Sequence, residues 1–188
     1  MILFVNACVR KGSRTKELAD CLLETAGEPY EELRLGELCF PNADGDFLER
    51  RARLEKKGEF GSPMFALARQ FAQADEIVIA APFWDLSFPA ALKQYFEQIN
   101  VLGVTFYYTP EGEPKGLCRA KRMTYITTAG GDHFPAEFGA GYAEALAKTF
   151  YGIPEFRLIK AVGLDLEGAD PRAKIEAAKE EIRKLYSP

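Results

Sequence analysis

The sequence predicts one α/β domain in which helices cover both faces of a parallel β-sheet. Short runs of apolar and branched residues alternate along the chain with stretches of helical spacing. The strongest run, EIVIAA at residues 76–81, is almost continuously apolar, which is typical of a strand buried on both faces. With 188 residues and 47% hydrophobic content, the whole chain, 1–188, is expected to form a single domain.

The first elements follow from local patterns. Residues 2–7 are a short branched run and predict a strand, and leucines at helical spacing predict a helix at 15–26. Residues 30–35 predict a second, more charged strand. Residues 36–62 are too long for an ordinary connection and are expected to hold a helix and a functional loop. Pro63 fits the first turn of a helix that ends near residue 74.

The second half continues the alternation with one interruption. Pro89 opens a helix that carries Leu92, Tyr95, Phe96 and Ile99 on one side. At 104–117 an aromatic run precedes Pro-Glu-Gly-Glu-Pro, which predicts an inserted β-hairpin, placed near the carboxyl edge of the sheet or its rim. Residues 122–127 and 156–162 predict the last two strands, with a helix at 136–150 between them. A final polar helix is expected at 171–186.

Composition argues against several classes of protein. A net charge of −4 and a pI near 5.3 give no electrostatic footprint for nucleic acid, and the basic residues at 50–57 alternate with acids as on a solvated helix face. Four scattered cysteines without a CxxC pair argue against a metal site and a disulfide framework. No membrane span or signal-peptide pattern is visible, so a cytoplasmic location is expected.

In an open α/β sheet, ligands bind beyond the carboxyl ends of the strands, where the strand order reverses. The loop after the first strand reads CVRKGSRT at residues 8–15. At a helix N-terminus, its amides and the hydroxyls of Ser13 and Thr15 could hold a phosphate, with charge from Arg14 or Arg10. Ser13 or Thr15 could equally be a plain helix cap beside exposed basic residues.

Two more loops are unusual. Residues 82–89, PFWDLSFP, offer an aromatic wall for a planar ring, although such a turn also suits core or dimer packing. Residues 127–134, TTAGGDHF, combine glycines that allow close backbone approach with the only histidine, His133. Each loop alone decides little. Their joint position after strands one, three and four predicts a ligand site.

Several motifs together resemble those of the flavodoxin-like NAD(P)H dehydrogenase (quinone) and FMN-dependent NADH-azoreductase family. They are APFW at 81–84, PAALKQYF at 89–96, GVTFYY at 103–108, GL at 116–117 and TTAGG at 127–131, in matching order and spacing. The resemblance covers nearly the whole chain. It implies a three-layer sandwich with strand order 2-1-3-4-5, FMN rather than FAD, and NADH or NADPH as co-substrate. It also implies a quinone, azo or nitro acceptor, ping-pong hydride transfer through flavin N5, and a homodimer with active sites at the interface.

The resemblance also assigns roles to residues. The cofactor-binding set that it implies is Ser13, Arg14, Thr15, Pro82, Phe83, Trp84, Asp85, Leu86, Thr128, Ala129, Gly130 and Gly131. His133 would lie near the reacting ring face, to stabilise the reduced flavin or position the substrate. Phe88, Phe106 and Tyr108 would shape the acceptor pocket. Asp85 stands where azoreductases commonly have asparagine, so the resemblance leaves its role open.

Two other functions remain open at this point. Cys8 and Arg14 have the Cys-x5-Arg spacing of a phosphatase loop, in which a thiolate attacks phosphorus. Low-molecular-weight phosphatases and related arsenate reductases carry such a loop after an N-terminal strand, and Asp170 before Pro171 could serve as their general acid. The third reading is a non-enzymatic flavodoxin-like electron carrier or partner-binding module.

Overall fold

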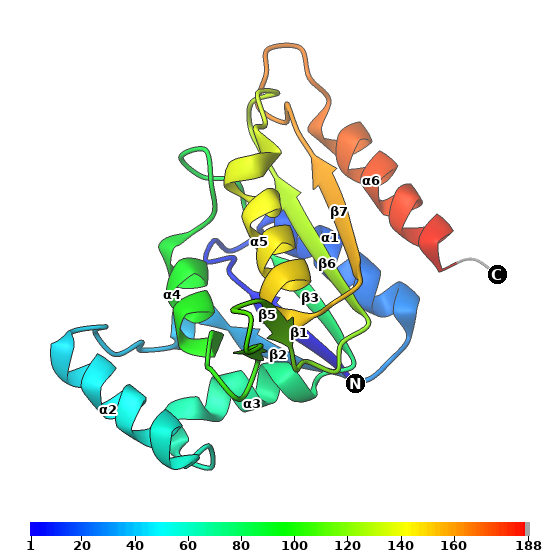
Figure 1. Cartoon of the computed structure of the whole chain (residues 1–188). Helices are drawn as coiled ribbons and strands as arrows, with labels where there is room; N and C mark the ends of the chain where they lie inside the picture. Colours follow the sequence, from blue (N-terminus) through cyan, green and yellow to red (C-terminus); the bar gives the residue numbers. More distant parts are fainter. Residues whose placement is uncertain (187–188) are drawn as a thin grey trace.

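A five-stranded parallel sheet forms the centre of the protein, which a computed structural model describes over residues 1–186 (Figure 1). Its strands lie in the order β2-β1-β3-β6-β7. Their bounds are β1 Ile2–Asn6, β2 Tyr30–Arg34, β3 Glu76–Ala80, β6 Arg122–Thr128 and β7 Glu155–Ala161. The predicted order 2-1-3-4-5 is confirmed, because β4 and β5 belong to a separate hairpin.

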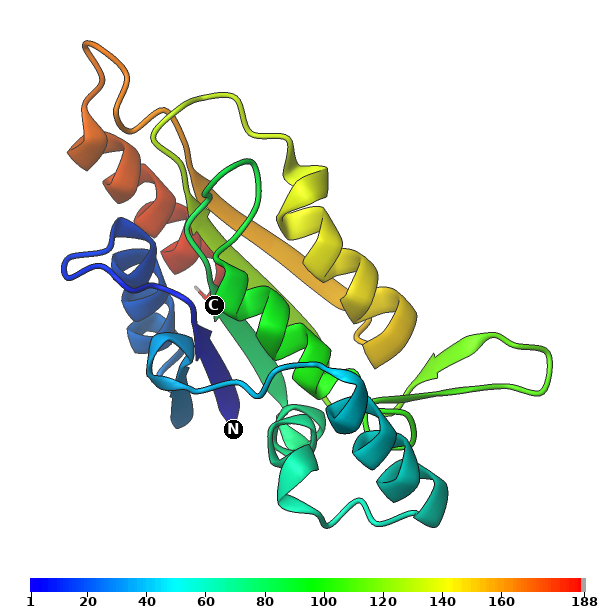
Figure 2. The same cartoon turned by 90° about the vertical axis from the view of Figure 1, so that its left-hand side faces the viewer.

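Helices cover both faces of this sheet (Figure 2). α1 (Arg14–Ala26) and α6 (Pro171–Leu185) pack on one face through Leu18, Leu22 and Ile182. α3 (Ala66–Gln73), α4 (Ala90–Ile99) and α5 (Ala140–Leu146) pack on the other face, over a larger and more aromatic core. The central strands β1, β3 and β6 are buried on both sides, which explains the nearly continuous apolar sequences of β1 and β3.

The long segment after β2 holds the expected helix. A short 3-10 turn at Leu35–Glu37 is followed by α2 (Gly45–Lys57), which Asp44 caps by accepting a hydrogen bond from the Phe47 amide at 2.9 Å. None of its residues is fully buried, and the helix stands off the body of the protein (Figure 1). Arg51 ties it to the main body by donating to the Glu97 carbonyl at 2.8 Å.

Two predicted helices are less regular than expected. Residues 63–74 begin with a 3-10 turn at Pro63–Phe65 before α3 starts. The predicted helix at 136–150 is divided into a 3-10 turn at Ala136–Phe138, α5, and a wider π-type turn at Ala147–Tyr151 (η4). Gly139 separates the first two pieces with a non-helical backbone (φ −121°, ψ −91°). Apolar spacing alone does not reveal such breaks, because the buried face continues across them.

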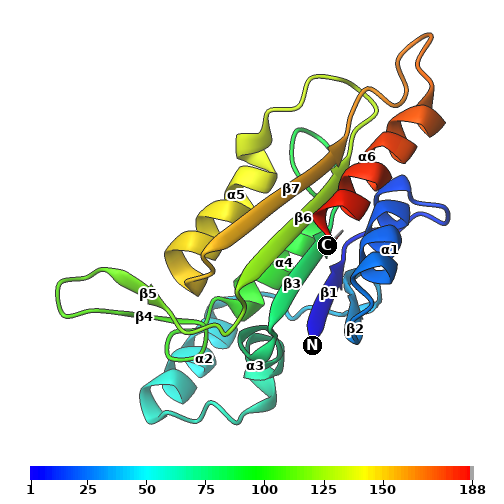
Figure 3. The ribbon, with the colours of Figure 1, turned by 90° about the vertical axis from the view of Figure 1, so that its right-hand side faces the viewer.

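The inserted hairpin exists, but its expected place in the fold is wrong. β4 (Phe106–Tyr108) and β5 (Pro114–Gly116) pair antiparallel, and β5 packs against η4 at the amino ends of the strands (Figure 3). Because α4 runs back from the carboxyl edge, the segment that follows it begins at the opposite edge. The backbone of Tyr151 approaches Gly116 so closely that an added Cβ would lie 2.1 Å from its carbonyl carbon.

Candidate cofactor site

A cavity of about 340 Å³ lies at the carboxyl ends of the strands, where the sequence places its candidate loops. It is lined by Val9, Arg10, Lys11, Gly12, Ser13, Arg14, Thr15, Pro82, Phe83, Trp84, Thr128, Ala129, Gly130, Leu164 and Asp165. The loops after β1, β3 and β6 therefore do meet. The loop after β7 joins them, which the sequence reasoning did not include.

The first loop leads into the N-terminus of α1. Ser13 caps this helix, since its hydroxyl accepts a hydrogen bond from the Lys16 amide at 3.3 Å. Gly12 has a left-handed backbone (φ 71°), which glycine adopts without strain. The cap and the cavity wall are thus one structure, with the positive end of the helix dipole and the basic residues Arg10 and Lys11 on the same side.

Thr15 and Thr128 join the first loop to the third. Their hydroxyl oxygens lie 2.7 Å apart, and both residues are buried. The Thr15 hydroxyl, a candidate phosphate ligand in the sequence, is therefore engaged with another side chain. It holds two walls of the cavity at a fixed separation.

Arg14 is also engaged. Its Nη1 donates to Asp165 Oδ1 at 2.8 Å, across to the loop after β7. Asp165 lies against Gly130, where an added Cβ would come within 2.5 Å of the carboxylate oxygen. The rule that ligands bind beyond strand ends could have identified Leu164 and Asp165, because they closely follow the last strand.

The second loop forms a tight turn. Trp84 and Ser87 exchange backbone hydrogen bonds of 3.0 and 2.8 Å, and Phe83 donates to the Thr128 carbonyl at 3.0 Å. Asp85 (φ 49°) and Leu86 (φ 65°) both occupy the left-handed region that non-glycine residues rarely adopt. The Ser87 hydroxyl fixes the turn by donating to the Phe138 carbonyl at 2.6 Å.

The aromatic wall is only partly as expected. Phe83 and Trp84 line the cavity; Phe83 packs against Phe134 with ring centroids 4.7 Å apart, and the Arg10 guanidinium lies over Trp84. Phe88 does not line it. Its half-buried ring instead packs against Phe96 and Tyr142 in the core.

Other candidate residues lie apart from the cavity wall. Asp85, Leu86, Gly131 and His133 are exposed, on loops whose neighbouring residues line the cavity. Phe106 and Tyr108 are at the other end of the sheet, where Phe106 stacks on Phe150 with centroids 4.5 Å apart. Within one copy of the chain, the hairpin therefore does not reach the candidate cofactor site.

The environment of Cys8 argues against a phosphatase. Burial raises the pKa of this thiol to about 11, so it remains protonated near neutral pH. Its sulfur lies 3.7 Å from the Ala80 carbonyl, and Arg14 is paired with an acid. Asp170 caps α6 by accepting from the Ala173 amide at 3.0 Å. The first loop therefore has neither a thiolate at Cys8 nor an unpaired Arg14, both of which a phosphatase loop needs.

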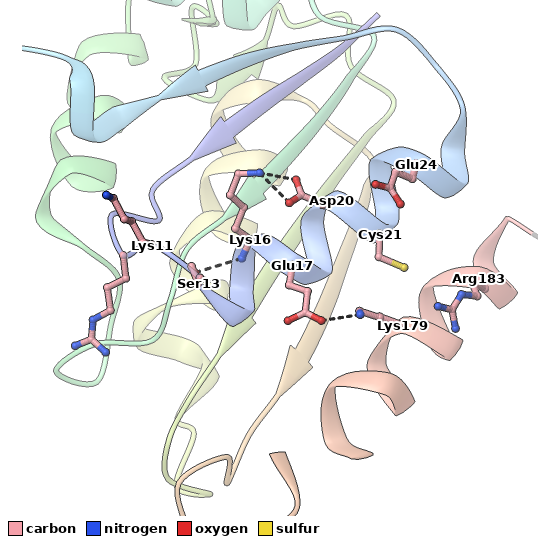
Figure 4. A pocket seen from close by; sticks show the side chains of 11 residues that line it. Lys11, Ser13, Lys16, Glu17, Asp20, Cys21, Glu24, Lys179 and Arg183 are labelled. Atoms are coloured by element: carbon pink, nitrogen blue, oxygen red, sulfur yellow. Dashed lines mark hydrogen bonds and ion pairs between the residues drawn. The ribbon is translucent and has the colours of Figure 1, made fainter. Parts of the chain in front are cut away.

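A second hollow, an open groove of about 590 Å³, runs between α1 and α6 behind the first loop (Figure 4). It shares residues 10–13 with the cavity. Four of its charged side chains form ion pairs: Lys16 contacts the Asp20 carboxylate at 2.7 Å, and Lys179 contacts Glu17 at 2.6 Å. Arg10 and Lys11, which line both hollows, take no part in these ion pairs.

Residues 1–186 lack two kinds of feature. They hold no helix that is both long and apolar enough to cross a bilayer. The same residues hold no group of three or more His, Cys, Asp or Glu side chains placed to bind a metal ion.

Comparisons with known proteins agree with the geometry. A family model described as flavodoxin-like fold matches residues 1–185. An FMN-dependent NADH:quinone oxidoreductase of Clostridium acetobutylicum is 44% identical over 200 residues, covering 98% of each chain. One from Lachnoclostridium phytofermentans is 36% identical over 188 residues, covering 95% of this chain and 94% of its own. The crystal structure of an azoreductase from Bacillus anthracis matches with a TM-score of 0.85 at 25% identity, covering 98% of this chain and 97% of its own.

Proposed function

Since the chain belongs to the flavodoxin-like family that includes the FMN-dependent NADH:quinone oxidoreductases, we propose that it is an FMN-dependent oxidoreductase that uses NADH or NADPH to reduce a quinone, azo or similar acceptor. The observation that carries this proposal is the cavity of about 340 Å³ in which four strand-end loops meet. Cavities of this size hold small ligands in proteins.

The residues that line the cavity include basic and aromatic side chains, which suit the two chemically different parts of FMN. Arg10, Lys11 and the capped N-terminus of α1 suit the phosphate. Phe83 and Trp84 suit the flat, apolar face of the isoalloxazine ring. The backbone of residues 128–131, where Gly130 and Gly131 carry no side chain, suits close approach of the polar pyrimidine edge.

FMN, when bound, supplies the redox chemistry, taking hydride from a nicotinamide and giving it to an acceptor in a ping-pong sequence. The protein binds and orients. Backbone amides of the second and third loops would stabilise negative charge at the ring edge, and His133, on the third loop, would be a further donor. No side chain is required as an indispensable general acid, because hydride transfer needs none.

We further propose a homodimer in which the hairpin of one copy completes the acceptor pocket of the other. A twofold axis perpendicular to the strands reverses their direction, so the amino end of one sheet lies beside the carboxyl end of its partner. The hairpin projects from the amino end (Figures 2 and 3) and exposes 43% of Tyr107 and 52% of Tyr108. This arrangement would bring Tyr108 to the acceptor pocket that the family resemblance implies, while Phe106 stays buried against Phe150 in its own copy.

Anaerobic titration tests the proposed activity. The purified chain should bind FMN, and NADH or NADPH should bleach the visible absorption of the bound flavin, which a quinone should restore. Flavin that binds but resists both nicotinamides would support an electron carrier instead. A colourless protein that hydrolyses an aryl phosphate, and loses this activity in Cys8→Ser, would support the phosphatase and refute the proposal.

Mixing two inactive variants tests the shared pocket. Trp84→Ala damages the cavity, and Tyr108→Ala damages the hairpin. After subunit exchange the mixture should recover about a quarter of wild-type activity, because half the dimers are hybrids with one intact site of two. Tyr107→Ala is the matched control, since its side chain lies on the other face of the same strand. No recovery in a mixture shown to contain hybrids would refute the shared pocket.

A further inference from the structure

Asp165 is held in place by its backbone, at the wall of the candidate cofactor cavity. Its amide donates to the Gly130 carbonyl at 2.9 Å. The two residues before it also donate to the third loop, Gly163 to Gly131 at 2.7 Å and Leu164 to Ala129 at 3.2 Å. Three consecutive amides thus fasten the loop after β7 along the Gly-Gly loop. Among the residues that line the cavity, Asp165 is the only acid.

The Asp165 carboxylate lies directly beside Gly130. It occupies the space beside Gly130 that a side chain would fill, since an ideal Cβ there would lie 2.5 Å from Asp165 Oδ2. Gly130 does not have a left-handed backbone, so its lack of a side chain is not needed for its conformation. The close approach of Asp165 gives glycine at this position a physical reason.

From this position Asp165 holds one edge of the Arg14 guanidinium. Arg14 Nη1 donates to Asp165 Oδ1 at 2.8 Å, while Nε and Nη2 of Arg14 have no partner among residues 1–186. Arginine carries five N–H donors in a rigid fork, so several remain for another anion. The two side chains are 41% and 64% exposed, and exposed ion pairs add little to stability. The contact is therefore poorly explained as a stabilising device.

We propose that Asp165 is a positioning residue for Arg14, which it holds ready to bind the phosphate of the flavin cofactor. Ordering a free arginine side chain opposes binding, and a guanidinium that is already oriented avoids most of this loss. The negative charge of Asp165 works against the phosphate, but Arg10, Lys11 and the N-terminus of α1 offset it. The inference rests on the proposed function, because its ligand is a flavin that carries a phosphate.

Flavin affinities test the proposal. The full-length protein, stripped of flavin, is titrated with FMN and with riboflavin, which lacks the phosphate. Asp165→Ala should weaken FMN binding by about tenfold and leave riboflavin binding nearly unchanged. Asp165→Asn keeps an acceptor oxygen without the charge, so its affinity for FMN should lie between those of the unaltered protein and Asp165→Ala. In an Arg14→Gln background, Asp165→Ala should have little further effect on FMN. Asp20→Asn is the control, because it removes a carboxylate from the groove on the other side of the first loop (Figure 4).

Each outcome of these titrations supports or overturns a different reading of Asp165. A selective loss of FMN affinity in the Asp165 variants, absent in Asp20→Asn, supports the positioning role. Equal or tighter FMN binding would show that Asp165 competes with the phosphate for Arg14, and would overturn the proposal. An equal loss for both flavins would overturn it too, since it would mean a general structural role. If the unaltered protein binds neither flavin, the proposed function itself fails.

Discussion

Replacing Gly130 by alanine places a methyl group where the Asp165 carboxylate now lies. The added Cβ would be 2.5 Å from Oδ2, closer than real Cβ atoms approach, and 3.3 Å from Cγ, which is a tight contact. Because Oδ2 is the far end of a side chain that is 64% exposed, Asp165 should turn away while the backbone stays in place. Arg14 then loses the partner that orients it.

The expected effect on stability is small. Losing an exposed ion pair costs about 0.2–1 kcal/mol. Gly130 does not require a positive φ, so alanine restricts the unfolded chain and returns about 0.4–1 kcal/mol. The free energy of unfolding should therefore change by less than about 1 kcal/mol, and Tm by no more than about 2–4 °C. Affinity for FMN should nevertheless fall by about tenfold, as for Asp165→Ala.

Gly61→Ala is the matched control, because Gly61 does not line the cavity. An added Cβ there meets nothing within 4 Å, and no positive φ is involved. Thermal unfolding gives the stability of both variants, and titrations with FMN and riboflavin give their affinities. The reasoning fails if the ratio of FMN to riboflavin affinity is the same in the two variants. Weaker riboflavin binding in Gly130→Ala alone would show that the methyl group meets the ring system instead.

Three further predictions, the first on a pair of tyrosines, concern residues that do not line the cavity. Tyr95→Phe should raise stability by about 1 kcal/mol in urea unfolding, because its buried hydroxyl has no partner among residues 1–186. Tyr151→Phe should lower the stability by a similar amount, because that hydroxyl donates a hydrogen bond of 2.6 Å to Asn100 Oδ1. A change in stability of the same sign in both variants would refute one of these two predictions. Burial raises the pKa of Cys8 to about 11, so peptide mass spectrometry should show iodoacetamide labelling exposed Cys39 first near neutral pH, with Cys8 gaining as the pH approaches 11. Equal labelling of the two thiols at neutral pH would contradict the raised pKa of Cys8. The same shift in pKa means that Cys8 favours the folded state below the ordinary thiol pKa, and this contribution is lost as the pH rises toward 11. Gly116→Ala should cost more than about 2 kcal/mol, since its Cβ would lie 2.1 Å from the Tyr151 carbonyl carbon; unchanged urea unfolding would show that the hairpin yields easily.

The sheet and the meeting of loops could be predicted because they depend on regular patterns. Branched apolar runs mark the parallel strands, and the position of a loop after a strand is enough to place it at the carboxyl edge. The hairpin lies at the opposite edge, because α4 carries the chain back from the carboxyl ends of the strands to their amino ends. Leu164 and Asp165 were missed because their loop contains no glycine pair or aromatic cluster.

Details of the site depend on contacts that sequence does not display. The Thr15 hydroxyl is buried against that of Thr128 only because the start of α1 and the end of β6 meet in space. The turn at Asp85 and Leu86 is harder still, since tight turns with two left-handed residues favour asparagine and glycine. Phe88 looked equally suited to a pocket or a core, and only the positions of Phe96 and Tyr142 place it in the core.

The buried contact between Thr15 and Thr128 bears on the order of events when the protein is made. It joins the first and third loops by side chains of this chain alone, 2.7 Å apart, so the walls of the cavity are set without help from a ligand. A newly synthesised chain can therefore fold first and acquire its cofactor later. By mass action, a cofactor that binds only the folded protein would then raise its stability further.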